Sequence, residues 1–323
     1  MRAARLDSLG ETPVPAEMDE PRRGEGQALV EVAAAPVNPI DLAVASGQFY
    51  AAGDQTPYVP GLEGLGRVVE GESLAPGTRV YFGAKGGLGG SDGSMAERTV
   101  IDEATAIEVP EGTDDALAAC FGIAGLAAWL PLEWRAELQE GETVLVLGAT
   151  GAVGTIAVQA AKLLGAGRVV AAARDADALE RLRPLGADAV VDLSSVDDAA
   201  EAFRDAAEGT VDVTLDPLWG DPVVAALEAS SPFARVVQIG QSAGAEATVP
   251  SAAVRGKPLA ILGHTNMAAP QEVKAAAYRR MVEEAAAGRL KVEYETYPLD
   301  RVTDMWEAQA AFPRRKLVLL PAA

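Results

Sequence analysis

A glycine-rich segment between an apolar run and an expected helix is the strongest chemical signal in the sequence. Residues 143–147 form an apolar run, which is typical of a strand buried on both faces. They lead into GATGAVG at 148–154, a variant of G-x-G-x-x-G because Ala149 stands where a glycine usually does. Glycines let the backbone approach a pyrophosphate, and the free N–H groups of a helix start attract its charge. The segment predicts a dinucleotide site whose contacts come from Thr150, Gly151, Ala152, Val153 and Gly154.

The next expected strand, over 169–173, ends where such a sheet carries the group that meets the ribose. Sheets that bind NAD place an Asp or Glu there to hold the ribose 2′-OH. Here Ala173 stands at that place and Arg174 follows, so a 2′-phosphate would meet a planar fork of donors. The sequence therefore predicts NADPH. The alternative is that Arg174 is a solvated charge and that Asp175 holds the ribose.

The middle of the chain alternates strands and helices, which predicts a doubly wound parallel sheet. Gly240 and Gly244 follow the carboxyl end of one strand, where sheet ligands bind, and are expected to allow close approach of a nicotinamide. The expected helices cover 153–164 and 177–185, and further strands are expected over 189–192, 211–216, 235–240 and 259–263.

The regions before and after this alternating segment differ from it in residue pattern. Proline and glycine interrupt residues 36–93 every few positions, which predicts a compact β-rich domain with tight turns. The uncharged run 116–132 is too short for a membrane span and is expected to be a buried helix. A long helix over 271–288 and a last strand from Lys316 are expected to return to the β-rich domain.

The composition excludes several kinds of function. The formal net charge is −20, which disfavours binding to nucleic acid or to anionic membranes. Cys120 is the only cysteine and His264 the only histidine, so a zinc site of the usual Cys/His type cannot form. An internal disulfide is also impossible. We expect no metal, and the lack of an apolar signal core at the N-terminus predicts a cytoplasmic protein.

Several motifs in a fixed order resemble the medium-chain dehydrogenase/reductase superfamily, in its zinc-free quinone oxidoreductase branch. They cover most of the chain. Besides the glycine loop they are APVNPIDL at 35–42, PGLEGLGRVVEG at 60–71, PGTRVY at 76–81, GSMAE at 93–97, IAGLAAW at 123–129 and RKLVL at 315–319.

The resemblance implies an α/β fold, in which a GroES-like catalytic domain (residues 1–121 and 264–323) is split by a Rossmann cofactor domain (residues 122–263). It also implies NADPH-driven reduction of a small electrophilic substrate by a homodimer that pairs through 259–263. Zinc-binding members carry a cysteine-type position where Asn38 stands here, and a His-Glu pair where Leu62 and Glu63 stand. Without a metal to polarise a simple carbonyl, the expected acceptor is a quinone or an α,β-unsaturated carbonyl.

The resemblance places three polar residues near the nicotinamide. Asn38 is expected to hydrogen-bond cofactor or substrate, or else to be only a turn residue before Pro39. Tyr50 is expected to orient or protonate the acceptor, or else to be a packed aromatic. Lys316 matches a basic residue near the cofactor, or else is a solvated charge before an edge strand.

Other polar residues of these motifs have structural interpretations. Asp41 is expected to cap the helix after the Asn-Pro turn, and Glu63 to be a hydrogen-bonding residue within a turn. His264 and Cys120 are interpreted as packing residues, and Ala127 stands where this branch often has threonine.

The resemblance leaves the reaction open between members of one fold. An enoyl or alkenal double-bond reductase is the alternative to a quinone reductase, because both reactions deliver a hydride to a conjugated acceptor. A non-catalytic NADPH-binding protein is the remaining alternative.

Overall fold

The computed structural model describes residues 1–49 and 52–323, which form two compact units. One unit comprises Met1–Ile123 and Tyr278–Ala323, and the other comprises Ala124–Ala277. One unit is built on a mostly antiparallel sheet and the other on a parallel sheet with helices, so the predicted α/β class is confirmed. The domain boundaries inferred from the sequence stay a prediction. No helix in the described part of the chain is long and apolar enough to cross a membrane.

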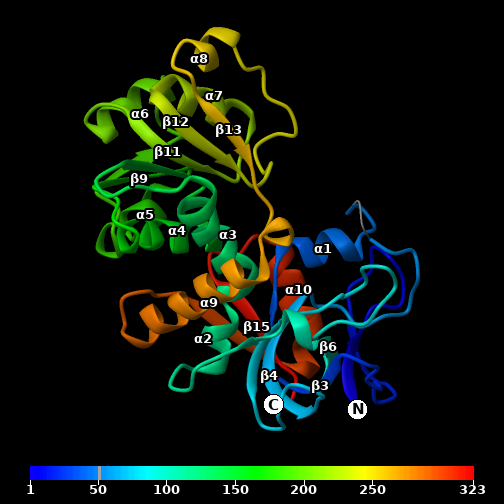
Figure 1. Cartoon of the computed structure of the whole chain (residues 1–323). Coiled ribbons are helices and arrows are strands. Elements are labelled where there is room, and N and C mark those ends of the chain that lie inside the picture. The colour runs from blue at the N-terminus through cyan, green and yellow to red at the C-terminus, as the bar shows by residue number, and fades with distance from the viewer. Residues whose placement is uncertain (50–51) are drawn as a thin grey trace. The chain divides into compact units, whose positions relative to one another are not determined.

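The unit Ala124–Ala277 is built on a six-stranded parallel sheet of order β10-β9-β8-β11-β12-β13 (Figure 1). The central strand β8 is buried along almost its whole length, whereas the residues of edge strand β13 alternate between half-buried and exposed. The chain runs from β8 to β9 on one side and later to β11 on the other, which creates a switch point at the carboxyl end of β8. The strands are β8 Thr143–Leu147, β9 Arg168–Ala173, β10 Ala189–Asp192, β11 Val211–Asp216, β12 Ser230–Gln238 and β13 Ala260–Gly263.

The helices of this unit connect successive strands, except α3, which precedes β8. The helix expected over 177–185 is wrong in one respect: α5 ends at Glu180, and a separate 3-10 turn follows at Arg183–Leu185. Pro184 lacks the N–H that an α-helix interior requires, which explains the break. The helices are α3 Leu126–Leu130, α4 Ala152–Leu163, α5 Ala176–Glu180, α6 Ala199–Ala207, α7 Gly220–Ala229 and α8 Ser251–Arg255.

The uncharged run 116–132 does not form one helix. Helix α2 (Asp115–Ala119) gives way to a π-helical turn at Phe121–Gly125, in which Gly122 has a non-helical ψ of −113°. A Cβ on Gly122 would overlap the Glu63 carboxylate and the Tyr81 ring, so only glycine fits this kink. The expectation of a single buried helix is therefore corrected.

The unit Met1–Ile123 with Tyr278–Ala323 is built on a mostly antiparallel sheet of order β14-β15-β3-β4-β5-β7, with β6 also paired to β3. A separate two-stranded sheet joins β1 and β2. The strands are β1 Arg2–Arg5, β2 Val14–Glu17, β3 Gln27–Val37, β4 Glu63–Glu70, β5 Arg79–Gly83, β6 Arg98–Asp102, β7 Ile107–Glu108, β14 Tyr294–Pro298 and β15 Lys316–Leu320.

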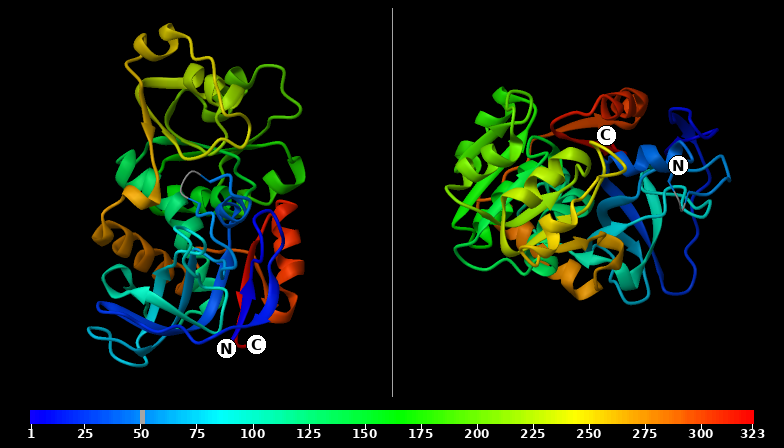
Figure 2. Two further views of the ribbon diagram at one scale, coloured as in Figure 1. Left: turned by 90° about the vertical axis from the view of Figure 1, so that its right-hand side faces the viewer. Right: turned by 90° about the horizontal axis from the view of Figure 1, so that it is seen from above.

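The last strand lies inside this sheet. β15 pairs with β3 on one side and with β14 on the other, so it is not an edge strand. In both views of Figure 2 the blue N-terminal and red C-terminal segments belong to this same unit. Helices α1 Pro39–Ala45 and α10 Val302–Ala310 belong to it, and α9 Gln271–Ala286 runs across the junction at 277/278.

Candidate functional site

The glycine loop joins the end of β8 to the start of α4, as the sequence predicts. Gly148 has a φ of +61°, a left-handed conformation that favours glycine. Gly151 is the N-cap of α4, with extended backbone angles. The first intrahelical bond runs from Thr155 N–H to Gly151 O, so the N–H groups of Ala152, Val153 and Gly154 precede the helix ladder. These N–H groups and the positive end of the helix can bind a phosphate.

Gly151 and Gly154 have different surroundings. A Cβ on Gly154 would overlap Gly148 O and lie 2.5 Å from Ala149 Cα, so this glycine permits close packing of helix and loop. A Cβ on Gly151 would meet only Gly148 O, at an ordinary 3.5 Å. The protein therefore leaves open space above Gly151, at the N-terminus of α4.

Arg174 follows the end of β9 and is exposed. It forms no hydrogen bond or ion pair with any residue of the described ranges. The neighbouring Asp175 carboxylate accepts the Ala178 N–H at 2.8 Å and caps α5. Arg174 thus has free donors at the strand end, whereas Asp175 is engaged by the backbone.

Two further loops meet the glycine loop at the same edge of the sheet. Pro217 and Leu218 follow β11, and a Cβ on Gly148 would lie 3.2 Å from each of their side chains. The loop after β12 joins them, because Ala243 N–H donates to Leu218 O at 2.8 Å and Ser242 N–H to Pro217 O at 3.2 Å. Gly240 is needed here, since a Cβ on it would lie 2.9 Å from Pro217 O. Gly244 lies in the same loop, where a Cβ would meet Gly220 and Glu246 O at 3.5 Å.

Asp216 organises the β11 loop and was missed by the sequence interpretation. Its buried carboxylate accepts the N–H groups of Leu218 and Trp219 through Oδ1, each at 2.9 Å. Burial raises the pKa of this carboxyl, and the two backbone hydrogen bonds oppose that rise. An acidic residue ending a buried strand was the signal in the sequence that could have identified it.

Asn38 and Lys316 meet in the other unit as parts of a buried polar network. Lys316 Nζ donates to Asn38 Oδ1 at 2.6 Å and to Val37 O at 3.2 Å. Asn38 Nδ2 donates to Glu63 Oε1 at 2.7 Å, and Lys316 Nζ lies 4.0 Å from that same oxygen. All three side chains are at most 3% exposed. The alternative in which Lys316 is a solvated charge before an edge strand is therefore wrong.

Glu63 is the hub of this network. Its Oε2 accepts Tyr81 OH at 3.0 Å and the Ile123 N–H at 2.5 Å. Tyr81 stacks on Tyr278 with ring centroids 4.5 Å apart. Burial raises the pKa of Tyr81 well above its ordinary value, with a further contribution from the Glu63 charge. These contacts describe a structural carboxylate, consistent with the interpretation of Glu63 as a hydrogen-bonding residue.

Asp41 completes the polar region at the start of α1. Asn38 is the N-cap, and Asp41 accepts its N–H at 2.7 Å and the Leu62 N–H at 2.9 Å. Burial raises the pKa of Asp41 to about 7, against the lowering effect of the Asn38 N–H. Asn38 thus has a structural role at the helix start, and its amide is hydrogen-bonded on both sides. A cofactor contact by Asn38 stays a prediction.

Three residues considered in the sequence remain: Tyr50, His264 and Cys120. Tyr50 lies outside the described residues. His264 packs edge-on against Trp134 with centroids 5.9 Å apart, and its Nε2 lies 3.1 Å from Asn266 Oδ1. Cys120 is buried, and burial raises the pKa of its thiol to about 12, so it is not a ready nucleophile. No three His, Cys, Asp or Glu side chains within 1–49 and 52–323 are arranged to hold a metal ion.

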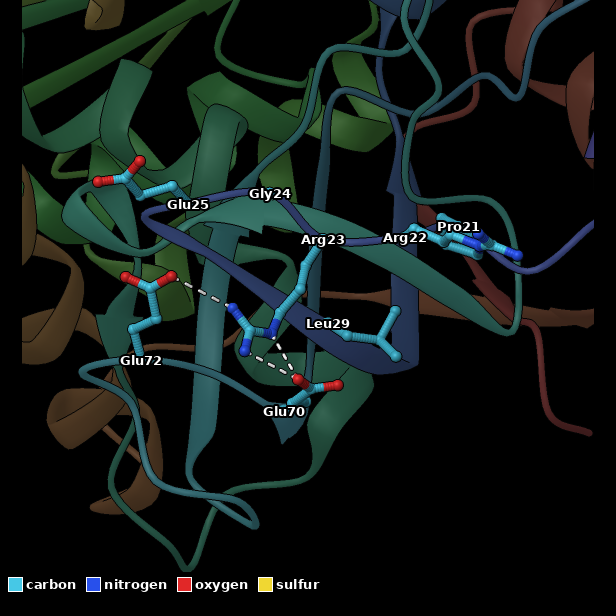
Figure 3. A pocket seen from close by; sticks show the side chains of 8 residues that line it. All are labelled: Pro21, Arg22, Arg23, Gly24, Glu25, Leu29, Glu70 and Glu72. Carbon is cyan, nitrogen blue, oxygen red and sulfur yellow. Dashed lines mark hydrogen bonds and ion pairs between the residues drawn. The ribbon is translucent and has the colours of Figure 1, made fainter.

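A surface depression of about 510 Å³ is lined by none of these residues (Figure 3). Within it Arg23 forms two ion pairs, from Nη2 to Glu70 Oε1 at 2.8 Å and from Nη1 to Glu72 Oε1 at 3.3 Å. Arg23 is thus engaged by two carboxylates of the hollow. Since no predicted site residue lines it, we place the candidate site at the carboxyl edge of the parallel sheet.

Comparison with known proteins identifies the family. Residues 24–111 match the family described as "Alcohol dehydrogenase GroES-like domain", and residues 152–283 match "Zinc-binding dehydrogenase". The chain is 31% identical to the Mus musculus "Quinone oxidoreductase-like protein 2" over 74% of this chain and 68% of that protein. The chain belongs to the medium-chain dehydrogenase/reductase superfamily.

Other members of the superfamily are similar over different extents. The Arabidopsis thaliana "NADPH-dependent alkenal/one oxidoreductase, chloroplastic" is 36% identical over 53% of this chain and 46% of its own length. The Escherichia coli quinone oxidoreductase complexed with NADPH superposes with a TM-score of 0.86 at 22% identity, covering 99% of this chain and all of that one. The chain spans only 14% and 45% of the lengths of two further relatives. The mouse, Arabidopsis and Escherichia coli proteins named here are each described as an oxidoreductase.

Proposed function

We propose that the protein is an NADPH-dependent reductase that transfers a hydride to a quinone or a related conjugated carbonyl without a metal. The observation that carries the proposal is the edge of the parallel sheet. There Gly151, the N-cap of α4, has open space around its Cα. Arg174, after the neighbouring strand β9, offers unpaired donors. These residues fit a dinucleotide that carries a 2′-phosphate.

The residues of the site would bind and orient the cofactor. The N–H groups at 152–154 would hold the pyrophosphate, Arg174 the 2′-phosphate, and the loop containing Gly240 and Gly244 the nicotinamide half. When bound, reduced NADPH supplies a hydride from C4 of its ring. The acceptor takes this hydride and one proton, which completes a two-electron reduction.

Tyr50 remains the proposed source or orienting group for that proton. Replacing it by phenylalanine removes only the hydroxyl. We expect a loss of about 10²–10⁴-fold in kcat/KM if the hydroxyl transfers the proton. A loss nearer tenfold is expected if it only orients the acceptor. A variant with unchanged kcat/KM would assign Tyr50 to packing.

The second candidate is reduction of an activated double bond in an enal or enone. It is favoured by the 36% identity to the alkenal/one oxidoreductase. Both candidates use the same cofactor site and differ only in the atom that accepts the hydride.

The cytoplasmic location stays a prediction.

A substrate panel tests the proposal. NADPH oxidation would be followed with a quinone, an alkenal, an enone and an enoyl thioester, each with and without EDTA or added zinc. We expect the quinone to react fastest, with rates unaffected by EDTA. Faster turnover of the alkenal or enoyl thioester would favour the second candidate. Stoichiometric NADPH binding without turnover of any substrate would indicate a non-catalytic protein.

A further inference from the structure

Trp219 has a backbone conformation that is normally reserved for glycine. Its φ is 56° and its ψ is −158°, in a region that side chains with a Cβ rarely adopt. Glu208 shows the contrast: its φ of 54° and ψ of 34° are the common left-handed geometry of a helix end. Tryptophan at position 219 is therefore strained, although glycine would satisfy the backbone.

The surrounding hydrogen bonds hold Trp219 in this conformation. Its N–H and that of Leu218 both donate to Asp216 Oδ1, whose carboxylate is fully buried. The carbonyls of Pro217 and Leu218 accept the N–H groups of Ser242 and Ala243. Strain of this kind persists when several contacts determine the backbone together, and it is concentrated at functional sites.

Trp219 is half-buried and lies in the loop that follows the carboxyl end of β11. It packs against the apolar cluster of Val223, Leu227, Ala234, Val236 and Leu259. Its indole N–H donates to no atom within the described ranges. The residue before it, Leu218, lies beside Gly148 of the glycine loop. Trp219 thus belongs to one of the loops that converge on the candidate site, and it is only half-buried there.

We propose that Trp219 is a cofactor-binding residue that packs against the nicotinamide half of the bound dinucleotide. This inference rests on the proposed function. With the pyrophosphate at the start of α4 and the 2′-phosphate at Arg174 after β9, the other half of the cofactor must extend across β8 toward β11 and β12. Trp219 lies three residues after the end of β11, at the N-cap of α7, and its flat ring matches a flat nicotinamide. This contact explains why tryptophan occupies a position that suits glycine.

Two ligands separate this contact from general effects on the site. NADPH carries both halves of the cofactor, whereas adenosine 2′,5′-bisphosphate carries only the half expected near Arg174. Dissociation constants for both would be measured by titration calorimetry for the wild-type protein, Trp219→Gly and Trp219→Phe. For Trp219→Gly we expect about tenfold weaker NADPH binding and unchanged affinity for the bisphosphate, within twofold. Trp219→Phe keeps an aromatic ring and should bind NADPH within about threefold of wild type.

Each alternative outcome contradicts the assignment. Equal weakening of both ligands in Trp219→Gly would show a purely structural role, and unchanged NADPH binding would show no contact. Wild-type protein that binds neither ligand would overturn the proposed cofactor, and this inference with it.

The backbone strain is tested separately by comparing Trp219→Gly with Trp219→Ala, because both variants lack the ring and differ only in the Cβ. If the backbone at position 219 is strained, Trp219→Gly should have a higher melting temperature than Trp219→Ala. A lower melting temperature for Trp219→Gly would refute the strain.

Discussion

Gly151 and Gly154 belong to one loop but are predicted to respond differently to the same substitution. Gly151→Ala adds a Cβ with only one ordinary contact, so the free energy of unfolding should change by less than about 0.5 kcal/mol. The same Cβ enters the space assigned to the pyrophosphate, so NADPH affinity should fall more than about tenfold. Gly154→Ala overlaps the backbone of Gly148 and should destabilise the fold by about 1–3 kcal/mol. Urea unfolding and NADPH titration measure both effects, and unchanged NADPH binding by Gly151→Ala would contradict the cofactor site.

Arg174 is predicted to select the phosphorylated cofactor. A charge-assisted hydrogen bond contributes about 1.5–3 kcal/mol, so Arg174→Ala should weaken NADPH binding about 10- to 150-fold. NADH affinity should change little, because NADH lacks the 2′-phosphate. Arg181→Ala is a matched control, since Arg181 is also exposed in this unit. Equal affinities of the unmodified protein for NADH and NADPH would refute the assignment.

At the scale of elements, β15, β4 and the start of α1 are joined by the Lys316–Asn38–Glu63 network. Lys316→Met removes the buried ammonium and leaves the Glu63 carboxylate without its nearest positive charge, at 4.0 Å. Breaking a buried pair in this way costs about 3–5 kcal/mol in the free energy of unfolding. Lys85→Met is the control at an exposed position of the same unit.

A double-mutant cycle distinguishes the network from simple packing. The double variant Lys316→Met/Glu63→Gln should lose less stability than the sum of the two single variants, because both charges are then absent. Additive losses would show that Lys316 and Glu63 do not interact.

The junction of α1 and β4 is predicted to make stability depend on pH through Asp41. Its pKa is about 7 in the folded protein and about 3.9 in an unfolded chain. Between these values the folded state binds more protons, so the contribution of Asp41 to the free energy of unfolding is greatest below pH 4. It declines as the pH rises to 7 and is constant above it.

Comparison with Asp41→Asn isolates this effect. The wild-type protein should lose more stability than Asp41→Asn when the pH rises from 4.5 to 7.5, as measured by urea unfolding at each pH. Asp19→Asn, at an exposed position, serves as the control. A parallel pH dependence in wild type and Asp41→Asn would contradict the buried, proton-binding carboxyl.

At the scale of the whole molecule, we propose a homodimer that pairs through β13. Among the described strands β13 pairs with β12 alone, and Ile261 on it is 37% exposed. An uncovered, apolar edge strand favours pairing with a second chain. Light scattering should give the mass of two 33.3 kDa chains, and Ile261→Glu should shift it to one. A single 33.3 kDa species for the wild-type protein would contradict the proposal.

The sequence by itself determined the class of the fold and the position of the glycine loop. The apolar run before Gly148 and the glycine spacing after it are local patterns, and local patterns depend on near neighbours in the chain. Residue counts were equally decisive, because one cysteine and one histidine exclude a Cys/His zinc site without any coordinates. The end of α5 before Pro184 was also readable in the sequence, although the expected helix ran through that proline.

Only the tertiary structure decided which polar residues share a site. Lys316 is 278 residues from Asn38, and its burial follows from the position of β15 between β14 and β3, which strand patterns do not specify. Asp216 and Trp219 gain their significance from the β12 loop folding back on Pro217 and Leu218. The φ of Trp219 is held by its local bond to Asp216 together with the bonds from the β12 loop to Pro217 and Leu218, against the preference of its own side chain. Such a conflict cannot be read from local sequence.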